Sequence, residues 1–173
     1  IGADTMSRII DYTDRSTCVL FGDGAGAMLV ESTEDGEGFI DFQNEIDGSG
    51  GPFLNMPAGG SRIPPSHETV AKRLHYVKQE GQQVFKYAVR KMYQSCTGVL
   101  DRNNLGPDDI ACLIPHQANK RTIWAVAERM GMQDRVIINI GDYGNTTAAT
   151  IPLATRDAIA WGRLKKGDLV VFA

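Results

Sequence analysis

The feature that most constrains the fold is an alternation of strand-like and helix-like segments towards the C-terminus. Short apolar runs typical of buried strands occur at IACLIPH (110–116), RVIINI (135–140) and DLVVFA (168–173). Helical patterns separate them, at residues 119–132 and 146–161. Strands and helices that alternate over short connections are typical of layered α/β folds. The sequence therefore predicts an α/β fold with a mixed sheet.

Two further helical features follow from the pattern of apolar residues. The segment 146–161 is apolar or small nearly all round, so we expect a buried helix, and Pro152 is expected to kink it. Residues 80–100 form the second feature, because apolar side chains recur there at helical spacing. These side chains are Val84, Phe85, Ala88, Val89 and Met92.

The first 67 residues are read as strands and loops. Residues 16–32 contain two β-rich runs around GDGAGA (22–27), and the glycine- and proline-rich stretch 33–67 leaves room for one strand at 39–47. A nucleotide cradle would need its glycines to lead from a strand into a helix. The strand-like AMLVES follows GDGAGA instead. We therefore interpret GDGAGA as a tight turn between strands and infer no nucleotide site.

Composition limits the possible partners. A length of 173 residues suits one domain, and a net charge of −3 gives no basic excess for nucleic acid or a membrane surface. An acidic partner would have to meet a local basic patch. The apolar runs are too short to span a bilayer. Because the chain starts without Met and stops inside an apolar run, we expect it to be a piece of something longer.

The three cysteines, Cys18, Cys96 and Cys112, are widely spaced and form no zinc-type cluster, so we expect reduced thiols in a cytoplasmic protein. Cys112 lies four residues before His116, which in an extended strand is about 13 Å and too far for a catalytic pair. All three are interpreted as small hydrophobic residues. No nucleophile is therefore expected in this chain.

His116 and Asn145 each follow a predicted strand and precede a predicted helix. Open α/β sheets bind their ligands at such carboxyl ends, and two donors there could form an oxyanion hole. A packed histidine and a helix-capping asparagine are the structural alternatives, and the residues alone leave both open.

Several motifs, in order, resemble β-ketoacyl-[acyl-carrier-protein] synthase III, the thiolase-fold condensing enzyme that starts bacterial fatty-acid synthesis. They are FGDGAGAMLVE (21–31), DGSG (47–50), MPAGGSRIP (56–64), GQQVFKYAV (81–89), PHQAN (115–119) with Arg121, and GNTTAA (144–149). The departures are small: Thr147 stands where the family more often has Ser, and Gln82 where it often has Asn or Arg.

The resemblance implies a thiolase-like fold of two duplicated halves, each with a mixed five-stranded sheet layered with helices, assembled as a homodimer. Residues 1–32 would end the first half, and 33–173 would form the second half without its last strand. The family's catalytic cysteine would then lie upstream of Ile1.

The resemblance also assigns roles to residues. His116 and Asn145 would be catalytic, stabilising the enolate formed when malonyl on acyl carrier protein loses CO₂; neither a metal nor a cofactor is expected. The substrates would be an acyl-CoA, usually acetyl-CoA, and malonyl-acyl carrier protein. Contacts to the CoA or pantetheine arm would come from Gly81, Gln82, Phe85, Ala118 and Asn119. The acidic carrier protein would meet Lys86, Gln117 and Arg121.

Two other functions stay open. The protein could be a related starter-unit condensing enzyme of polyketide or quinolone synthesis, because the same motifs are shared there. Alternatively, the chain could bind the carrier protein without catalysing a reaction, since we expect its nucleophile to be missing. On composition alone, Lys86 is also compatible with an ordinary solvated helix face.

Overall fold

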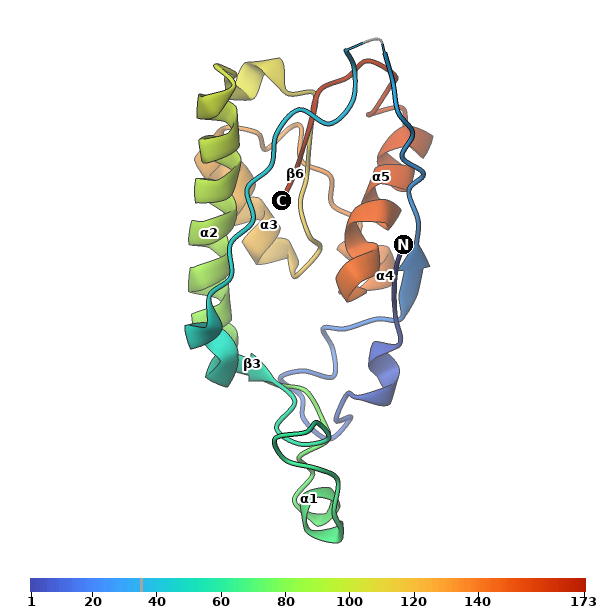
Figure 1. The fold of residues 1–173 in the computed structure, drawn as a ribbon, viewed down its shortest axis with the longest axis vertical. Helices are drawn as coiled ribbons and strands as arrows, with labels where there is room; N and C mark the ends of the chain where they lie inside the picture. The colour runs from blue at the N-terminus through green and yellow to red at the C-terminus, as the bar shows by residue number, and fades with distance from the viewer. Residues whose placement is uncertain (35) are drawn as a thin grey trace.

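The computed structural model describes residues 1–34 and 36–173 (Figure 1). The strands are β1 (Gly2–Asp4), β2 (Gly24–Gly26), β3 (Leu54–Asn55), β4 (Lys78–Gln79), β5 (Cys112–Ile114) and β6 (Val170–Phe172). The α-helices are α1 (His67–Ala71), α2 (Gly81–Arg102), α3 (Lys120–Met130), α4 (Ile140–Tyr143) and α5 (Thr150–Ala160). Short 3-10 helices are η1 (Met6–Arg8), η2 (Gly48–Phe53), η3 (Pro107–Asp109) and η4 (Thr147–Ala149).

Strand β5 is the centre of a three-layer core. It pairs in parallel with β6, with Leu113 opposite Val171. Successive side chains of a strand point to opposite faces. Leu113 accordingly packs into a cluster with residues of α2 and α3, whereas Cys112 and Ile114 pack with residues of α5. In Figure 1, β6 lies between α2 and α3 on one side and α5 on the other.

The helices of this core follow the predicted pattern. Helix α2 spans the amphipathic segment and buries Val89, Cys96 and Leu100. Helix α3 begins where the Asn119 side chain accepts a hydrogen bond from the backbone N–H of Thr122 at 2.8 Å. It ends at Gly131, whose φ of 67° is the left-handed conformation that favours glycine. The predicted helices, β5 and β6 are therefore confirmed.

The predicted strand RVIINI is only partly formed. Its backbone runs beside β5, because Leu113 N–H donates to Arg135 at 3.1 Å and Ile137 N–H donates to Leu113 at 2.9 Å. These contacts give one isolated parallel bridge between Leu113 and Val136 rather than a strand. The chain then turns into the short helix α4.

The sheets are smaller than predicted, although the α/β class is confirmed. Within the described residues the strands form three two-stranded sheets, β1–β2, β3–β4 and β5–β6, rather than one five-stranded sheet. The segment 39–47, predicted as a strand, forms none. Its side chains instead bond to α2: Lys91 pairs with Glu45, and Arg102 with Asp41. These contacts hold the segment against α2.

The prediction of a tight turn at GDGAGA is wrong. Residues 24–26 are strand β2, which pairs antiparallel with β1. The glycines are explained by close packing instead. A Cβ added at Gly22 would lie 2.1 Å from the carbonyl oxygen of Tyr143, and one at Gly26 would lie 2.6 Å from Cβ of Pro152. Only glycine allows this approach of the first residues to α4 and α5.

The two expectations about helix 146–161 are also wrong. Pro152 is the third residue of α5, within the first turn, where backbone N–H groups have no partner inside the helix. Proline there removes no helical hydrogen bond, and α5 runs unbroken from Thr150 to Ala160. The helix is buried on one side only, because Ile159 is 58% exposed.

The segment from β3 to β4 projects away from the core and carries α1 (Figure 1). It is tied to the first residues by Asp11, whose carboxylate accepts hydrogen bonds from Arg73 at 2.5 and 3.1 Å. Val77 packs beside Met6 and Ile10. None of the helices in the described part of the chain is long and apolar enough to cross a membrane.

Candidate functional site

His116 lies two residues after the end of β5 and is held at its backbone and at its ring. Its N–H donates to the carbonyl of Ala173, and its carbonyl accepts from Ala118 N–H at 2.9 Å. The ring nitrogen Nδ1 lies 2.7 Å from the hydroxyl oxygen of Thr150, the first residue of α5. Burial lowers the pKa of His116 below its usual value. The ring is therefore mainly neutral at pH 7.

Asn145 is fixed by residues that are distant in sequence. Its N–H donates to Leu20 at 2.9 Å, and its carbonyl accepts from Gly22 N–H at 3.0 Å. The side-chain oxygen accepts from Thr147 N–H at 2.9 Å. The side chain is 8% exposed, and its amide nitrogen donates to no group among the described residues. Thr146, not Asn145, is the N-cap residue of η4, so the contact with Thr147 is a local turn that occupies the oxygen and leaves the nitrogen as a free donor.

The segment 145–150 joins the two residues. Asn145 stands two residues before η4, and Thr150, the partner of His116, follows η4 directly. Thr147 between them has a φ of 50°, which is strained for a β-branched residue. Asp4 holds this conformation, because its carboxylate accepts from the Thr147 hydroxyl and from Ala148 N–H at 3.1 Å. These hydrogen bonds lower the pKa of Asp4, so the carboxylate is charged at neutral pH.

Chemically, this segment can bind a developing negative charge. The free amide of Asn145 is a preorganised donor, and the start of α5 carries the positive end of a helix dipole. Donors held before the reaction need no reorganisation when charge forms, which is what an oxyanion hole requires. Sequence reasoning missed Asp4, Thr147 and Thr150. A hydroxyl in a run of small residues gives no signal of its own, and Asp4 is separated from Thr147 by most of the chain.

The prediction that Gln117 binds the carrier protein does not fit its environment. The side chain is 1% exposed. Its nitrogen donates to Pro115 at 2.8 Å and to Ile137 at 3.1 Å, and its oxygen accepts from Asn139 N–H at 3.1 Å. Gln117 therefore links the end of β5 to the neighbouring backbone and offers no surface to a protein partner.

The other predicted binding residues remain accessible. Ala118 and Asn119 are half-buried at the start of α3, and Arg121 is exposed. Asn119 uses its side-chain oxygen as the cap of α3, while its nitrogen donates to no described residue. No carboxylate within the described residues forms an ion pair with Arg121.

The predicted residues of α2 occupy its first two turns. Gly81, Gln82, Phe85 and Lys86 are all exposed. Lys86 also lines a cavity of about 610 Å³ between α2 and η2. Arg90, one turn further along, and Gln83 line the same cavity. Lys86 thus belongs to a basic edge of the cavity that includes Arg90.

The cysteines are placed as small hydrophobic residues. Burial raises the pKa of Cys96 to about 12 and also raises the pKa of Cys112. The thiol of Cys112 lies 3.1 Å from the carbonyl of Arg163. Cys18 is half-buried beside the cluster of Met6, Ile10 and Val77. A thiol with a raised pKa is a poor nucleophile at neutral pH, since the thiolate is the reactive form.

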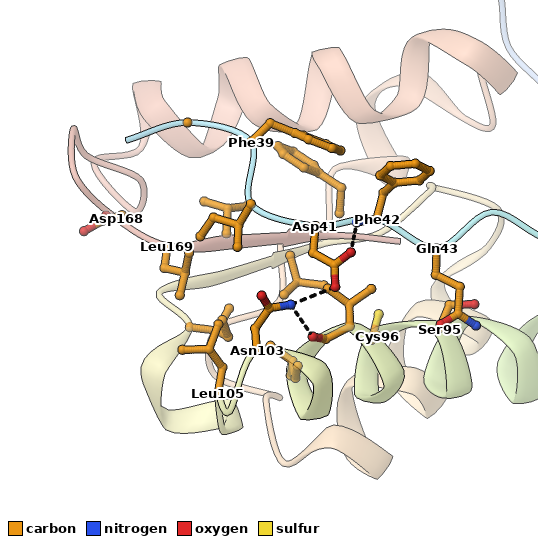
Figure 2. Close-up of a pocket in the computed structure, with 18 of the residues that line it drawn as sticks. Phe39, Asp41, Phe42, Gln43, Ser95, Cys96, Asn103, Leu105, Asp168 and Leu169 are labelled. Carbon is orange, nitrogen blue, oxygen red and sulfur yellow. Dashed lines mark hydrogen bonds between the residues drawn. The ribbon is translucent and has the colours of Figure 1, made fainter. Parts of the chain in front are cut away.

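A further cavity of about 360 Å³ lies under residues 38–44, against α2 and β6 (Figure 2). Figure 2 shows Asp41 turned towards Asn103, whose side-chain nitrogen donates to it at 2.8 Å. The walls are mostly apolar, and Cys96 and Leu169 belong to them. None of the predicted site residues lines this cavity, so it is separate from His116 and Asn145.

Comparison with known proteins identifies two family profiles in the chain. Residues 1–48 match 3-oxoacyl-[acyl-carrier-protein] synthase III, and residues 100–173 match the C-terminal part of the same enzyme. The chain belongs to this family. The second match contains both His116 and Asn145.

Individual relatives agree with this assignment. The chain is 70% identical to β-ketoacyl-[acyl-carrier-protein] synthase III of Solibacter usitatus, over 100% of its own length and 54% of the relative. The crystal structure of 3-oxoacyl-[acyl-carrier-protein] synthase III from Aquifex aeolicus matches with a TM-score of 0.87 and 38% identity, over 99% of this chain and 51% of the other.

A priming β-ketosynthase from a polyketide biosynthetic pathway matches with a TM-score of 0.80 and 26% identity, over 98% of this chain and 50% of the other. The fold is thus thiolase-like, as the motifs implied. The chain spans about half the length of the curated relatives it matches.

Proposed function

We propose that the full-length protein is a cytoplasmic condensing enzyme that joins an acyl-CoA, preferably acetyl-CoA, to malonyl-acyl carrier protein in the initiation of fatty-acid synthesis. The observation that carries this proposal is the free amide of Asn145, aligned by the same short segment that binds the ring of His116. The names of the relatives support the reaction class.

In this reaction the malonyl group loses CO₂, and its thioester becomes an enolate that attacks the acyl group. Asn145 and His116 would both hydrogen-bond the thioester oxygen, where the negative charge develops. Removing one such donor costs about 3 kcal/mol of barrier. The two hydrogen-bond donors stabilise the enolate charge in this scheme, so the proposal includes no metal or cofactor.

The acyl group itself requires a nucleophilic cysteine. Burial and a raised pKa make Cys96 and Cys112 unsuitable, and Cys18 packs as a half-buried hydrophobic residue against the cluster of Met6, Ile10 and Val77. We therefore place the acyl-accepting cysteine in a part of the full-length protein outside this chain. The boundary between the two duplicated halves, near residue 32, and the homodimer belong to the same proposal.

The carrier protein would dock on exposed cations. Lys86 and Arg121 are exposed, and within the described part of the chain neither is paired with a carboxylate. Arg90, which lines the same cavity as Lys86, would be a third docking cation. A protein of net charge −3 needs such a local patch to attract an acidic partner. Gly81, Gln82, Phe85, Ala118 and Asn119 would contact the pantetheine arm.

A second candidate is a starter-unit condensing enzyme of polyketide synthesis, which the similarity to the priming β-ketosynthase favours. The chemistry at His116 and Asn145 would be unchanged, and only the acyl or carrier partner would differ. Offering the full-length protein several acyl-CoAs and both types of carrier protein separates the two candidates, because the preferred pair forms product fastest.

The proposal is tested with His116→Ala and Asn145→Ala in the full-length protein, supplied with labelled acetyl-CoA and malonyl-acyl carrier protein. We expect condensation to fall at least about 100-fold in each variant. Acetyl transfer to the protein should be largely kept. Normal condensation by both variants would contradict the proposed roles. A labelled thioester on Cys112 of this chain alone would contradict the placement of the nucleophile.

A further inference from the structure

The hydroxyl of Thr150 lies between two hydrogen-bonding groups. Its oxygen is 2.9 Å from the carbonyl oxygen of Thr147 and 2.7 Å from Nδ1 of His116. Thr150 is 2% exposed, so water does not compete for the hydroxyl. No other described residue forms a hydrogen bond with the His116 ring.

The hydroxyl carries one proton, and the two contacts compete for it. A carbonyl oxygen only accepts, whereas a histidine nitrogen can accept or donate. The 2.9 Å contact with Thr147 is therefore a hydrogen bond only if the hydroxyl donates to the carbonyl. Nδ1 must then supply the proton for the second contact. In the opposite arrangement, two oxygens would face each other at 2.9 Å with no proton between them.

The carbonyl of Thr147 is not free to turn away. Its residue has the left-handed φ of 50°, and Asp4 binds both the Thr147 hydroxyl and the next backbone N–H. The same carbonyl accepts the backbone N–H of Thr150. The orientation of the acceptor, and with it the direction of the hydroxyl proton, is therefore set by residues of β1 and η4.

We propose that Thr150 is a positioning residue that keeps the proton of neutral His116 on Nδ1 and the lone pair on Nε2. The catalytic meaning of this assignment rests on the function proposed above. The place of the proton itself can be measured without substrate.

The assignment separates the roles of the two catalytic residues. In the neutral ring Nε2 accepts hydrogen bonds, so it donates to an enolate oxygen only after the ring has taken up a second proton from solvent. Nδ1 still donates to Thr150 in that charged form. Asn145, by contrast, is a donor in every protonation state. Oxyanion binding would therefore begin with Asn145, and His116 would join as an imidazolium.

The test is a nitrogen NMR spectrum of the chain labelled with ¹⁵N-histidine, in which protonated and lone-pair nitrogens are well separated. His116→Gln assigns the ring signals against those of His67 and His75. We expect a protonated Nδ1 and a lone-pair Nε2 in neutral His116, and the same pattern in Thr150→Ser, which keeps the hydroxyl. Thr150→Val should instead give a mixture of both tautomers.

A neutral His116 that carries its proton on Nε2 would overturn the proposal, and so would an unchanged spectrum of Thr150→Val. The spectrum of the unmodified chain decides the proton's place even if the valine variant does not fold. Failure of the proposed function is a separate result: normal condensation by His116→Ala would remove the catalytic role and leave the tautomer assignment standing.

Discussion

Strand β5 and the segment 36–47 both carry closely spaced apolar side chains, but they lie in opposite environments. Leu113 and Ile114 in β5 are fully buried, whereas Phe39 is 81% exposed and Ile46 is 101% exposed. Helices cover β5 on both faces. Residues 36–47 contact α2 chiefly through Asp41 and Glu45. Apolar content therefore decides burial only where neighbouring elements supply a surface, and the two regions should respond differently to substitution.

Leu113→Ala should give the largest effect on stability. It removes a fully buried side chain from the cluster beneath α2 and α3, and such substitutions cost about 2–5 kcal/mol. The measurement is the free energy of unfolding from urea titration. Ile46→Ala is the matched control in the exposed segment and should stay within about 0.5 kcal/mol. Equal losses in both variants would mean that the two regions do not differ.

Gly22→Ala tests the close contact between the first residues and the core. The added Cβ would lie 2.1 Å from the carbonyl oxygen of Tyr143, so backbone must move, at a cost of about 1–3 kcal/mol. Gly60→Ala is the control, because nothing lies within 4 Å of its added Cβ. If thermal unfolding of both variants matched that of the unmodified chain, the packing explanation for GDGAGA would be wrong.

The Asp11–Arg73 contact should make stability depend on acidity. Hydrogen bonds from Arg73 hold the pKa of Asp11 well below its usual value. The ionised carboxylate therefore contributes fully to the free energy of unfolding above pH 4 to 5. This contribution is lost as the pH falls towards and through the lower pKa of the folded state. Asp11→Asn should be less stable at pH 7 and should lose less stability than the unmodified chain on acidification. Urea titrations between pH 7 and pH 3 measure the free energy of unfolding of both proteins. If both lost the same amount on acidification, Asp11 would not be the source of the pH dependence.

Thr146→Val should give the smallest effect, and with the opposite sign. The Thr146 hydroxyl is the only buried side-chain polar atom among the described residues without a hydrogen-bond partner. An unsatisfied buried group costs about 1–3 kcal/mol, so valine should stabilise the chain by about 1 kcal/mol. Calorimetric melting measures the change. A loss of stability would show that the hydroxyl has a partner in solution.

The same contrast explains what could be predicted from sequence. Helices α2 and α3, the stop at Gly131 and strands β5 and β6 follow from local periodicity and capping. The role of the glycines in GDGAGA could not be predicted from the local sequence, because it depends on the distant backbone of Tyr143 and the ring of Pro152. Whether the segment 39–47 pairs as a strand depends on its neighbours, which periodicity does not reveal.

The candidate site divides in a similar way. The positions of His116 and Asn145 at the ends of strand-like segments could be predicted from sequence order. Their partners could not, because Thr150 meets His116 and Leu20 meets Asn145 only after folding. Asp4 likewise reaches Thr147 and Ala148, in the segment between the two residues, only in the folded chain. The burial of Gln117 could not be predicted either, because glutamine is usually exposed. Its three hydrogen bonds join stretches of backbone that are separate in the sequence.

The central claim is that Asn145 donates to the oxygen on which the enolate charge forms. Release of labelled CO₂ from malonyl-acyl carrier protein by the full-length protein measures this step without the condensation that follows it. We expect Asn145→Ala to lower the rate of CO₂ release about 100- to 1,000-fold while the protein stays folded. A rate within twofold of the unmodified protein would contradict the central claim.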